Sequence, residues 1–248
     1  MHEDTFFEQL DTNFKFNNLK FDSDKSLIFY KFYNSLINEN KKYNLTSLTT
    51  SEDIIQKHFI DSILPLCQIS SKIDSFNFKD FNTIIDFGCG AGFPLLPFLI
   101  FSDDKNFIES EFFFIDSNNK KILFLKNFLE QIKAEFGINI NCRHDRIEDL
   151  LIKDSSNKKI LLLGRAITKY ENLLNYIKRF IKLNQIEEIS FIYLAGPKFN
   201  AISDNQLKKI FNNDFKISQF FYKYNHSKPK FKRVLYLINL KKLSQICR

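Results

Sequence analysis

The placement of glycine constrains this chain more than any other feature. Only six glycines occur among 248 residues, and three of them, Gly88, Gly90 and Gly92, stand within five positions. An apolar run that suits a buried strand, 83–87, leads into them, and an apolar stretch that suits a helix, 95–101, follows. A glycine loop between strand and helix lets the backbone approach a ligand closely. The pattern predicts a nucleotide-like cofactor at the carboxyl edge of a parallel sheet.

The spacing of these glycines indicates which cofactor the loop holds. The order is G-x-G-x-G, led by Asp86, whereas nicotinamide and flavin enzymes use G-x-G-x-x-G. We therefore expect S-adenosylmethionine rather than a dinucleotide. The other three glycines each follow a helical stretch or end an apolar run, and we expect them mainly at turns along the same sheet edge: Gly137, Gly164 and Gly196.

Residues after the next two predicted strands are candidates for binding the sugar and the base. Asp116 ends an apolar run and can accept hydrogen bonds from ribose hydroxyls, with a helix N-cap as the alternative. Ile147 and Glu148 begin the turn after the third predicted strand, where an adenine ring would lie between an apolar and a polar residue. For Glu148 the alternative is a solvated acid at the start of a helix.

Strand-like and helical patterns alternate through the middle of the chain, which predicts a parallel sheet. Two later β-rich runs are joined by a loop too short for a crossover helix, so they must pair antiparallel. The predicted strands cover 83–87, 111–115, 138–143, 159–163, 190–195, 215–224 and 233–240. The expected fold class is α/β: a Rossmann-like S-adenosylmethionine-dependent methyltransferase whose seven-stranded sheet has five parallel strands plus a C-terminal antiparallel pair.

Ahead of the first strand, apolar residues recur at helical spacing over 27–42 and 53–66. We expect an N-terminal helical extension, 1–75, packed on the Rossmann-like methyltransferase domain, 76–248. His58, Asp61 and Ser62 share one face of the second of these helices. They form either a polar wall of the substrate cleft or a hydrogen-bonded set that fixes the helical layer onto the sheet.

Cysteine usage and hydropathy exclude several classes of protein. Four cysteines, none in a C-x-x-C pair, argue against a disulfide framework and a zinc site, and we expect no metal: Cys67, Cys89, Cys142 and Cys247. Cys89 is expected to serve only as a small residue between glycines, not as a nucleophile. No apolar stretch reaches the length that spans a bilayer, so we expect a cytoplasmic protein without membrane contact.

The positive charge of the chain is concentrated at its C-terminal end. The formal net charge is +7; residues 215–248 hold nine Lys and Arg and no acid, and the rest holds 27 against 29. Basic residues mixed with aromatics fit phosphate contact and base stacking, so we expect RNA contacts at Lys228, Lys230, Lys232 and Arg233, extended by Lys120 and Lys121. An ordinary solvated basic hairpin is the alternative, because the abundant Lys, Asn, Ile and Phe suggest an AT-rich genome.

Six pieces of sequence, spread over nearly the full length, resemble one protein family. They are Tyr43-Asn-Leu-Thr46, Lys57-His-Phe-Ile-Asp-Ser62, Asp86-Phe-Gly-Cys-Gly-Ala-Gly-Phe-Pro94, Ile115-Asp-Ser117 with Lys120-Lys121 and Phe124-Leu125, Arg146-Ile-Glu148, and Gly164-Arg-Ala166. The chain resembles the bacterial glucose-inhibited division protein B family, the guanine-N7 methyltransferases of 16S ribosomal RNA. The glycine loop alone indicates only a methyltransferase, and the pieces before and after it single out this family.

The resemblance implies a set of residues that bind S-adenosylmethionine: Gly88, Phe93, Ile147, Glu148 and Arg165. From their positions in the glycine loop and at strand ends, we also expect Asp86, Gly90, Gly92 and Asp116 to bind the cofactor. The sequence departs from the family at four positions. The family usually has arginine in place of Lys57 and glycine in place of Leu95, and it usually has serine in place of Gly164 and lysine in place of Ala195. These departures leave the methyltransferase assignment in place.

The resemblance also implies a mechanism and a partner. Guanine N7 already carries an in-plane lone pair, so no general base is expected, and proximity and orientation supply the catalysis. Arg165, which stays charged, is expected to anchor the cofactor or the guanine. We expect a monomer whose partner is 16S ribosomal RNA, in its decoding region, or the small ribosomal subunit. Two alternatives stay open: a small-molecule methyltransferase and a non-catalytic ribosome-binding or assembly factor.

Overall fold

The computed structural model describes residues 2–20, 24–74, 76–102, 110–132, 139–155, 158–167, 170–196, 204–212, 214–223 and 232–241. The strands are β1 (Thr83–Phe87), β2 (Glu111–Asp116), β3 (Asn139–His144), β4 (Ile160–Arg165), β5 (Ile189–Ala195), β6 (Phe215–Lys223) and β7 (Lys232–Leu240). The helices are α1 (Glu3–Phe16), α2 (Asp24–Tyr43), α3 (Ser51–Ile54), α4 (Asp61–Lys72), α5 (Leu95–Phe101), α6 (Asn119–Gln131), α7 (Tyr170–Asn184) and α8 (Asp204–Phe211).

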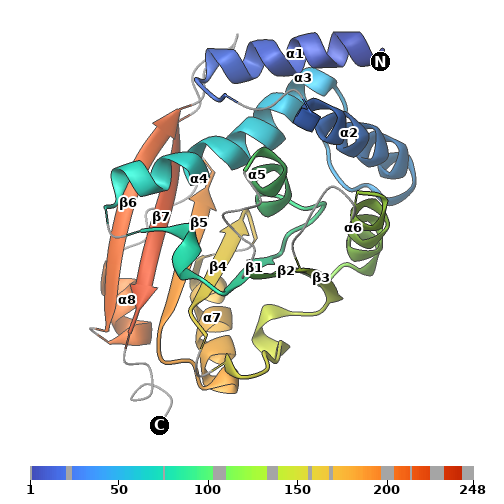
Figure 1. Ribbon diagram of the computed structural model, residues 1–248. Helices are drawn as coiled ribbons and strands as arrows, with labels where there is room; N and C mark the ends of the chain where they lie inside the picture. Colours follow the sequence, from blue (N-terminus) through green and yellow to red (C-terminus); the bar gives the residue numbers. More distant parts are fainter. Residues whose placement is uncertain are drawn as a thin grey trace.

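One seven-stranded sheet, in the order β3-β2-β1-β4-β5-β7-β6, forms the centre of the molecule (Figure 1). Strands β1 to β5 pair parallel, β5 pairs antiparallel with β7, and β7 pairs antiparallel with β6. Strand β6 therefore runs in the direction of the core strands and β7 alone is reversed. The reversal brings the start of β7 to the same edge of the sheet as the carboxyl ends of β1, β2 and β4.

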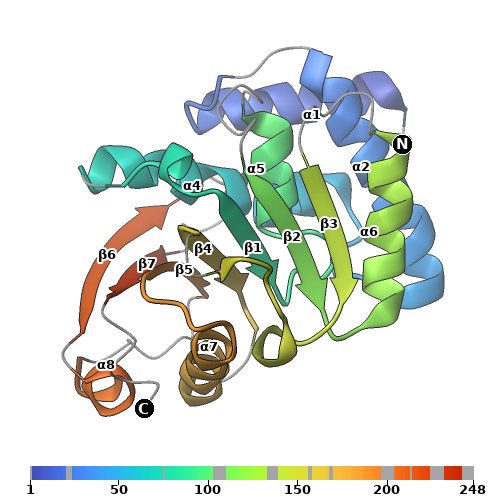
Figure 2. The same cartoon turned by 60° about the horizontal axis from the view of Figure 1, so that its bottom comes forward.

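Helices cover both faces of the sheet (Figure 2). Adjacent strand residues point to opposite faces, so Ile84 belongs to the core under α4, α5 and α6, whereas Ile85 belongs to the core with α7 and α8. Strand β1 is buried along its whole length, as expected for a central parallel strand with helices on both faces. The predicted α/β fold with five parallel strands and a C-terminal antiparallel pair is confirmed.

The N-terminal helices pack on one face of the sheet at its carboxyl edge (Figure 1). The ring of Phe32 on α2 lies 5.7 Å from that of Phe59, 5.5 Å from that of Phe93 and 4.9 Å from that of Phe128 on α6, centroid to centroid. The helical layer and the sheet therefore share one hydrophobic core. The division of the chain at residues 75 and 76 stays a prediction.

The helix predicted over 53–66 is longer than expected and contains a π-helical segment. Helix α3, the π-helical residues Ile55–Ile60 (η1) and α4 follow one another without a break. Such segments often mark functional sites, and here His58 lies within it. Helix α1 was not predicted, although its buried residues Phe6, Leu10 and Phe14 have helical spacing.

The remaining elements agree with the predicted ones to within a few residues, with two exceptions among the glycines. Gly164 lies inside β4, directly before Arg165, so its expected position at a turn is wrong. Gly137 lies outside the described residues. Within the part of the chain that the structure describes, no helix is both long and apolar enough to cross a membrane.

Candidate active site

The glycine loop after β1 has the left-handed backbone that its sequence predicts. The φ angles are 63° at Gly88, 59° at Gly90 and 103° at Gly92, a region that residues with a Cβ rarely adopt. A Cβ at Gly92 would lie 2.9 Å from Leu125, so this glycine is needed for packing against α6. A Cβ at Gly90 would meet only the ammonium of Lys121, at 3.8 Å. A side chain at Gly90 would therefore point into open space, so the backbone of Gly90 is accessible to a ligand from that direction.

Asp86, at the carboxyl end of β1, is buried beneath this loop. Its Oδ2 accepts a hydrogen bond from the backbone N–H of Leu95 at 3.0 Å, at the start of α5. Its Oδ1 is buried and has no hydrogen-bond partner among the described residues. Burial raises the pKa of Asp86 to about 8. The carboxyl group thus joins the end of β1 to the start of α5, and its second oxygen has no partner among the described residues.

Asp116, at the carboxyl end of β2, holds the glycine loop from the other side. Its Oδ2 accepts from the N–H of Gly90 at 2.9 Å, and its Oδ1 accepts from the N–H of Asn118 at 2.8 Å. Asn118, not Asp116, is the N-cap of α6, because its side chain accepts from the N–H of Lys120. The N-cap alternative for Asp116 is therefore wrong. Each carboxylate oxygen retains a lone pair for a further donor.

Ile147 and Glu148 follow β3 in a short 3₁₀ turn, η5 (Ile147–Asp149). Both side chains are buried. The carboxylate of Glu148 lies 3.9 Å from the guanidinium of Arg146. The alternative that Glu148 is a solvated acid is wrong, because only 7% of the residue is exposed.

Arg165 ends β4 and points into the N-terminal layer. Its Nη1 donates to Ser62 Oγ at 3.2 Å and to the carbonyl of Lys57 at 3.5 Å, and its Nη2 lies 3.1 Å from Nδ1 of His58. The guanidinium also lies over the ring of Phe93, 5.2 Å from the centroid. One cation therefore contacts both the glycine loop and the π-helical segment.

The contact with Arg165 fixes the tautomer of His58. Because a guanidinium only donates, Nδ1 of His58 accepts, and its Nε2–H donates to Thr46 Oγ1 at 2.8 Å. Burial lowers the pKa of His58 well below its ordinary value, and the charge of Arg165 lowers it further. His58 is therefore a neutral acceptor, unsuited to proton transfer.

Asp61 completes the group, which we call the Arg165 cluster: His58, Asp61, Ser62, Arg165, Tyr222 and Arg233. Asp61 Oδ2 lies 3.6 Å from Arg165 Nη1, and its Oδ1 lies 3.2 Å from Arg233 Nε. The hydroxyl of Tyr222 donates to the same Oδ1 at 3.2 Å. Of the two interpretations of His58, Asp61 and Ser62, the hydrogen-bonded set between helical layer and sheet matches these contacts. No sequence motif links Tyr222 to Asp61; Tyr222 pairs in register with Arg233.

Ile167 lies between two glycines of the site. A Cβ at Gly164 would lie 2.5 Å from Ile167 Cδ1, and one at Gly88 would lie 3.1 Å from Ile167 Cγ1. The isoleucine side chain thus fills the space that a side chain at Gly164 would need.

The loop residue Cys89 is fully buried, and burial raises the pKa of its thiol well above the ordinary value. The high pKa disfavours the reactive thiolate.

The residues expected to contact RNA lie in different surroundings. Lys120 has its ammonium over the ring of Tyr43, 5.9 Å from the centroid, whereas Lys121 lies beside Gly90. The side chain of Arg233 is only 19% exposed, against Asp61. Lys228 and Lys230 lie outside the described residues, as does the side chain of Lys232, the first residue of β7.

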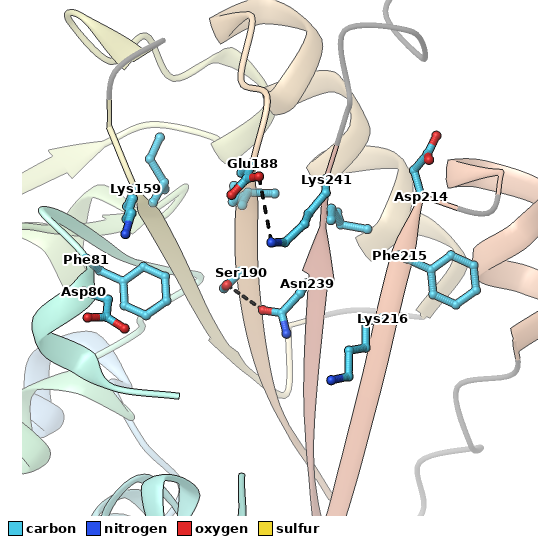
Figure 3. Close-up of a pocket in the computed structure, with 13 residues that line it drawn as sticks. Asp80, Phe81, Lys159, Glu188, Ser190, Asp214, Phe215, Lys216, Asn239 and Lys241 are labelled. Atoms are coloured by element: carbon cyan, nitrogen blue, oxygen red, sulfur yellow. Dashed lines mark hydrogen bonds and ion pairs between the residues drawn. The ribbon is translucent and has the colours of Figure 1, made fainter. Parts of the chain in front are cut away.

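A cavity of about 570 Å³ opens at the opposite, amino edge of the sheet, where β4 and β5 begin and β7 ends (Figure 3). Ser190 donates to Asn239 there at 2.6 Å, and Glu188 lies 3.9 Å from Lys241. None of the predicted site residues lines this cavity. It is separate from the candidate active site, which lies where the cofactor is held in open α/β sheets.

Comparison with known proteins identifies close relatives of the chain. The model of the GidB family, described as rRNA small subunit methyltransferase G, matches residues 26–211. A protein named ribosomal RNA small subunit methyltransferase G from Clostridium tetani is 37% identical over 193 residues, 77% of this chain and 72% of the relative. A protein of the same name from Mesoplasma florum is 34% identical over 187 residues, which are 75% of this chain and 68% of the relative.

The fold is also found among solved structures of methyltransferases. The crystal structure of magnesium protoporphyrin IX methyltransferase from Synechocystis PCC 6803 with bound SAM superposes with a TM-score of 0.50 at 12% identity. The superposition covers 88% of this chain and 97% of that one. At this identity the likeness concerns the fold alone, and it confirms the expected methyltransferase architecture.

Proposed function

Because the chain belongs to the GidB family, rRNA small subunit methyltransferase G, we propose that it transfers a methyl group from S-adenosylmethionine to N7 of a guanosine in 16S ribosomal RNA. Family membership over residues 26–211 carries the proposal, because the matched region contains the whole glycine loop, Asp116, Glu148 and Arg165. The alternatives, a small-molecule methyltransferase and a non-catalytic assembly factor, are not favoured by these relatives.

The geometry of the glycine loop fits S-adenosylmethionine. The open space beside Gly90 lies close to the remaining lone pairs of the Asp116 carboxylate, because a hydrogen bond of 2.9 Å joins the two residues. Asp86 Oδ1 is a buried polar atom without a hydrogen-bond partner among the described residues. We assign cofactor binding to Asp86, Gly88, Gly90, Gly92, Phe93, Asp116, Ile147, Glu148 and Arg165. The bound cofactor would supply a methyl group on a positively charged sulfur.

The residues of the chain orient the reactants and transfer no proton. Guanine N7 attacks through its own lone pair, and neutral His58 is occupied by Arg165 and Thr46 on its two ring nitrogens. Arg165 anchors the cofactor or the guanine from its place beside Phe93. Holding nucleophile and methyl group in line is the main contribution to rate that we assign to the site.

The assignment of RNA contacts stays a proposal. Lys228, Lys230 and Lys232 belong to a segment without acidic residues, and Lys120 and Lys121 lie at the carboxyl edge near the glycine loop. Arg233, which pairs with Asp61, is the weaker candidate for an RNA contact. Positive charge at the edge that binds the cofactor would hold RNA phosphates next to the transferred methyl group. We propose that the chain acts on this RNA as a monomer in the cytoplasm.

The test is methyl transfer from labelled S-adenosylmethionine to 16S RNA and to purified small subunits, followed by mass mapping of the modified nucleotide. We expect one 7-methylguanosine. Arg165→Lys keeps the charge but not the planar set of donors, so it should lower kcat at least tenfold with a smaller effect on stability. Label found on a small molecule, or cofactor binding without transfer to either RNA substrate, would contradict the proposal.

A further inference from the structure

Asp61 connects three parts of the chain that are far apart in sequence. It begins α4 in the N-terminal layer and contacts Arg165 at the end of β4, together with Tyr222 on β6 and Arg233 on β7. Its side chain is 5% exposed, and those of Arg165 and Arg233 are 14% and 19% exposed. The contacts therefore form in the interior, where a charged group is stable only when it is paired.

The negative charge of Asp61 lies between the positive charges of Arg165 and Arg233, so the packing of the two arginines depends on Asp61. Burial raises the pKa of Asp61, whereas Arg165, Arg233 and the hydroxyl of Tyr222 oppose that effect by favouring the ionised form. The two guanidiniums repel each other, and Asp61 lies in ion-pair distance of both. Without this carboxylate, the repulsion would push Arg165 away from its present position over Phe93.

The same helical turn supplies the other partners of Arg165. The carbonyl of Lys57, the ring of His58 and the hydroxyl of Ser62 all face the guanidinium from the segment that contains Asp61. Within the described part of the chain, the hydrogen-bond acceptors of Arg165 thus all belong to the N-terminal layer and none to the sheet. The position of the guanidinium relative to the glycine loop is therefore set by a part of the chain outside the cofactor-binding fold.

We propose that Asp61 is a positioning residue of the methyl-transfer site, which holds the Arg165 guanidinium against Phe93 and links it to the C-terminal strand pair through Tyr222 and Arg233. The proposal rests on the proposed function, in which Arg165 anchors the cofactor or the guanine. It makes the N-terminal helical layer a part of the active site instead of a cover over it.

The test is a double-mutant cycle between Asp61→Asn and Arg165→Lys. Titration calorimetry gives the Kd of S-adenosylmethionine, and methyl transfer to 16S RNA gives kcat. If Asp61 acts through Arg165, we expect Asp61→Asn to change kcat, Kd or both by about tenfold in the wild type and by less than about threefold in Arg165→Lys. Equal effects in the two backgrounds, or no effect in either, would overturn the proposal.

Two further variants separate positioning from stability. Glu111→Gln removes an ion pair of similar length but greater exposure, with Lys158 at 3.2 Å, at the amino edge. It should leave kcat and Kd unchanged even if the thermal midpoint falls. Asp61→Glu restores the charge and should recover part of the lost activity, whereas recovery of stability alone would count against positioning.

If Asp61→Asn does not fold, Tyr222→Phe takes its place, since it removes only the hydroxyl that donates to Asp61. We then expect Tyr222→Phe to change kcat or Kd by about threefold in the wild type and to leave both unchanged in Arg165→Lys. The same change in both backgrounds would overturn the proposal. The Kd measurements need no RNA. A wild-type protein that binds the cofactor but methylates no guanine would refute the proposed function, and the cycle on Kd would still decide the role of Asp61.

Discussion

The imidazole of His58 stacks on the ring of Phe93, with centroids 4.2 Å apart and planes at 15°. Phe93 belongs to the glycine loop and His58 to the π-helical segment, so the N-terminal layer contacts the proposed cofactor site directly. The stack also places Nδ1 of His58 where Arg165 donates to it. A protonated ring would bring a second donor and a second positive charge to that contact.

This contact predicts how stability depends on pH. The folded pKa of His58 lies well below 6.5, so below that pH the unfolded chain binds more protons and stability falls as the pH drops. His58→Gln should lose less stability than wild type between pH 7 and pH 5, as measured by urea unfolding. His144→Gln is the control, since His144 is exposed. Parallel curves for His58→Gln and wild type would show that His58 titrates normally.

Asp86 predicts a pH dependence of the opposite sign. Its folded pKa of about 8 exceeds the ordinary 3.8, so the folded protein binds more protons and loses stability as the pH rises from about 4 to 8. Asp86→Asn should gain stability over wild type across this window, by at most about 1.4 kcal/mol per pH unit. Exposed Asp11→Asn should show no such trend. A gain that does not grow with pH would mean that Asp86 is ionised in the fold.

Gly90 and Gly92 should respond differently to the same substitution. Gly90→Asn introduces a side chain into open space at a φ that Asn tolerates, so we expect little change in thermal midpoint and at least a tenfold weaker binding of S-adenosylmethionine. Gly92→Asn collides with Leu125 and Leu96 and should cost about 1–3 kcal/mol of stability. Calorimetry and thermal unfolding check both, and unimpaired cofactor binding by Gly90→Asn would mean that the cofactor lies elsewhere.

The C-terminal basic residues should control RNA affinity through released counterions. Replacing Lys228, Lys230 and Lys232 together by Gln should weaken RNA binding and leave the affinity for S-adenosylmethionine unchanged. The slope of the logarithm of the RNA-binding constant against the logarithm of the salt concentration should become less steep by up to about 2. The control changes two exposed lysines of α8 to Gln, Lys208 and Lys209. If the triple variant and the control have the same slope as wild type, the basic hairpin is ordinary surface, and Lys120 and Lys121 become the stronger candidates.

The sheet could be predicted from sequence because its central strands are apolar on both faces and are punctuated by scarce glycines. Short apolar runs such as Thr83–Phe87 and Ile160–Arg165 favour buried strands over helices because they are only five or six residues long and lie beside or contain a glycine. Helix α1 was missed although Phe6, Leu10 and Phe14 have helical spacing, so its pattern is present in the sequence. Gly164 was misplaced because a glycine inside a strand and one at a turn look alike in sequence.

The candidate site was only partly predictable for a related reason. Residues at the ends of parallel strands, such as Asp86 and Asp116, meet at one edge by topology, so the pattern alone locates them. The contacts of Asp61 with Tyr222 and Arg233 depend on how the N-terminal layer packs against a reversed strand, which no local pattern specifies. Arg233 was therefore expected at an RNA surface, whereas the structure places it in ion-pair distance of Asp61.

The position of Ile167 between Gly88 and Gly164 has a consequence for related sequences. Since a side chain at position 164 would overlap Ile167 Cδ1, and the same isoleucine limits the space at Gly88, the residues at these positions are not independent. A relative with serine in place of Gly164 should carry a smaller or differently branched residue in place of Ile167. The two positions should therefore covary across the family.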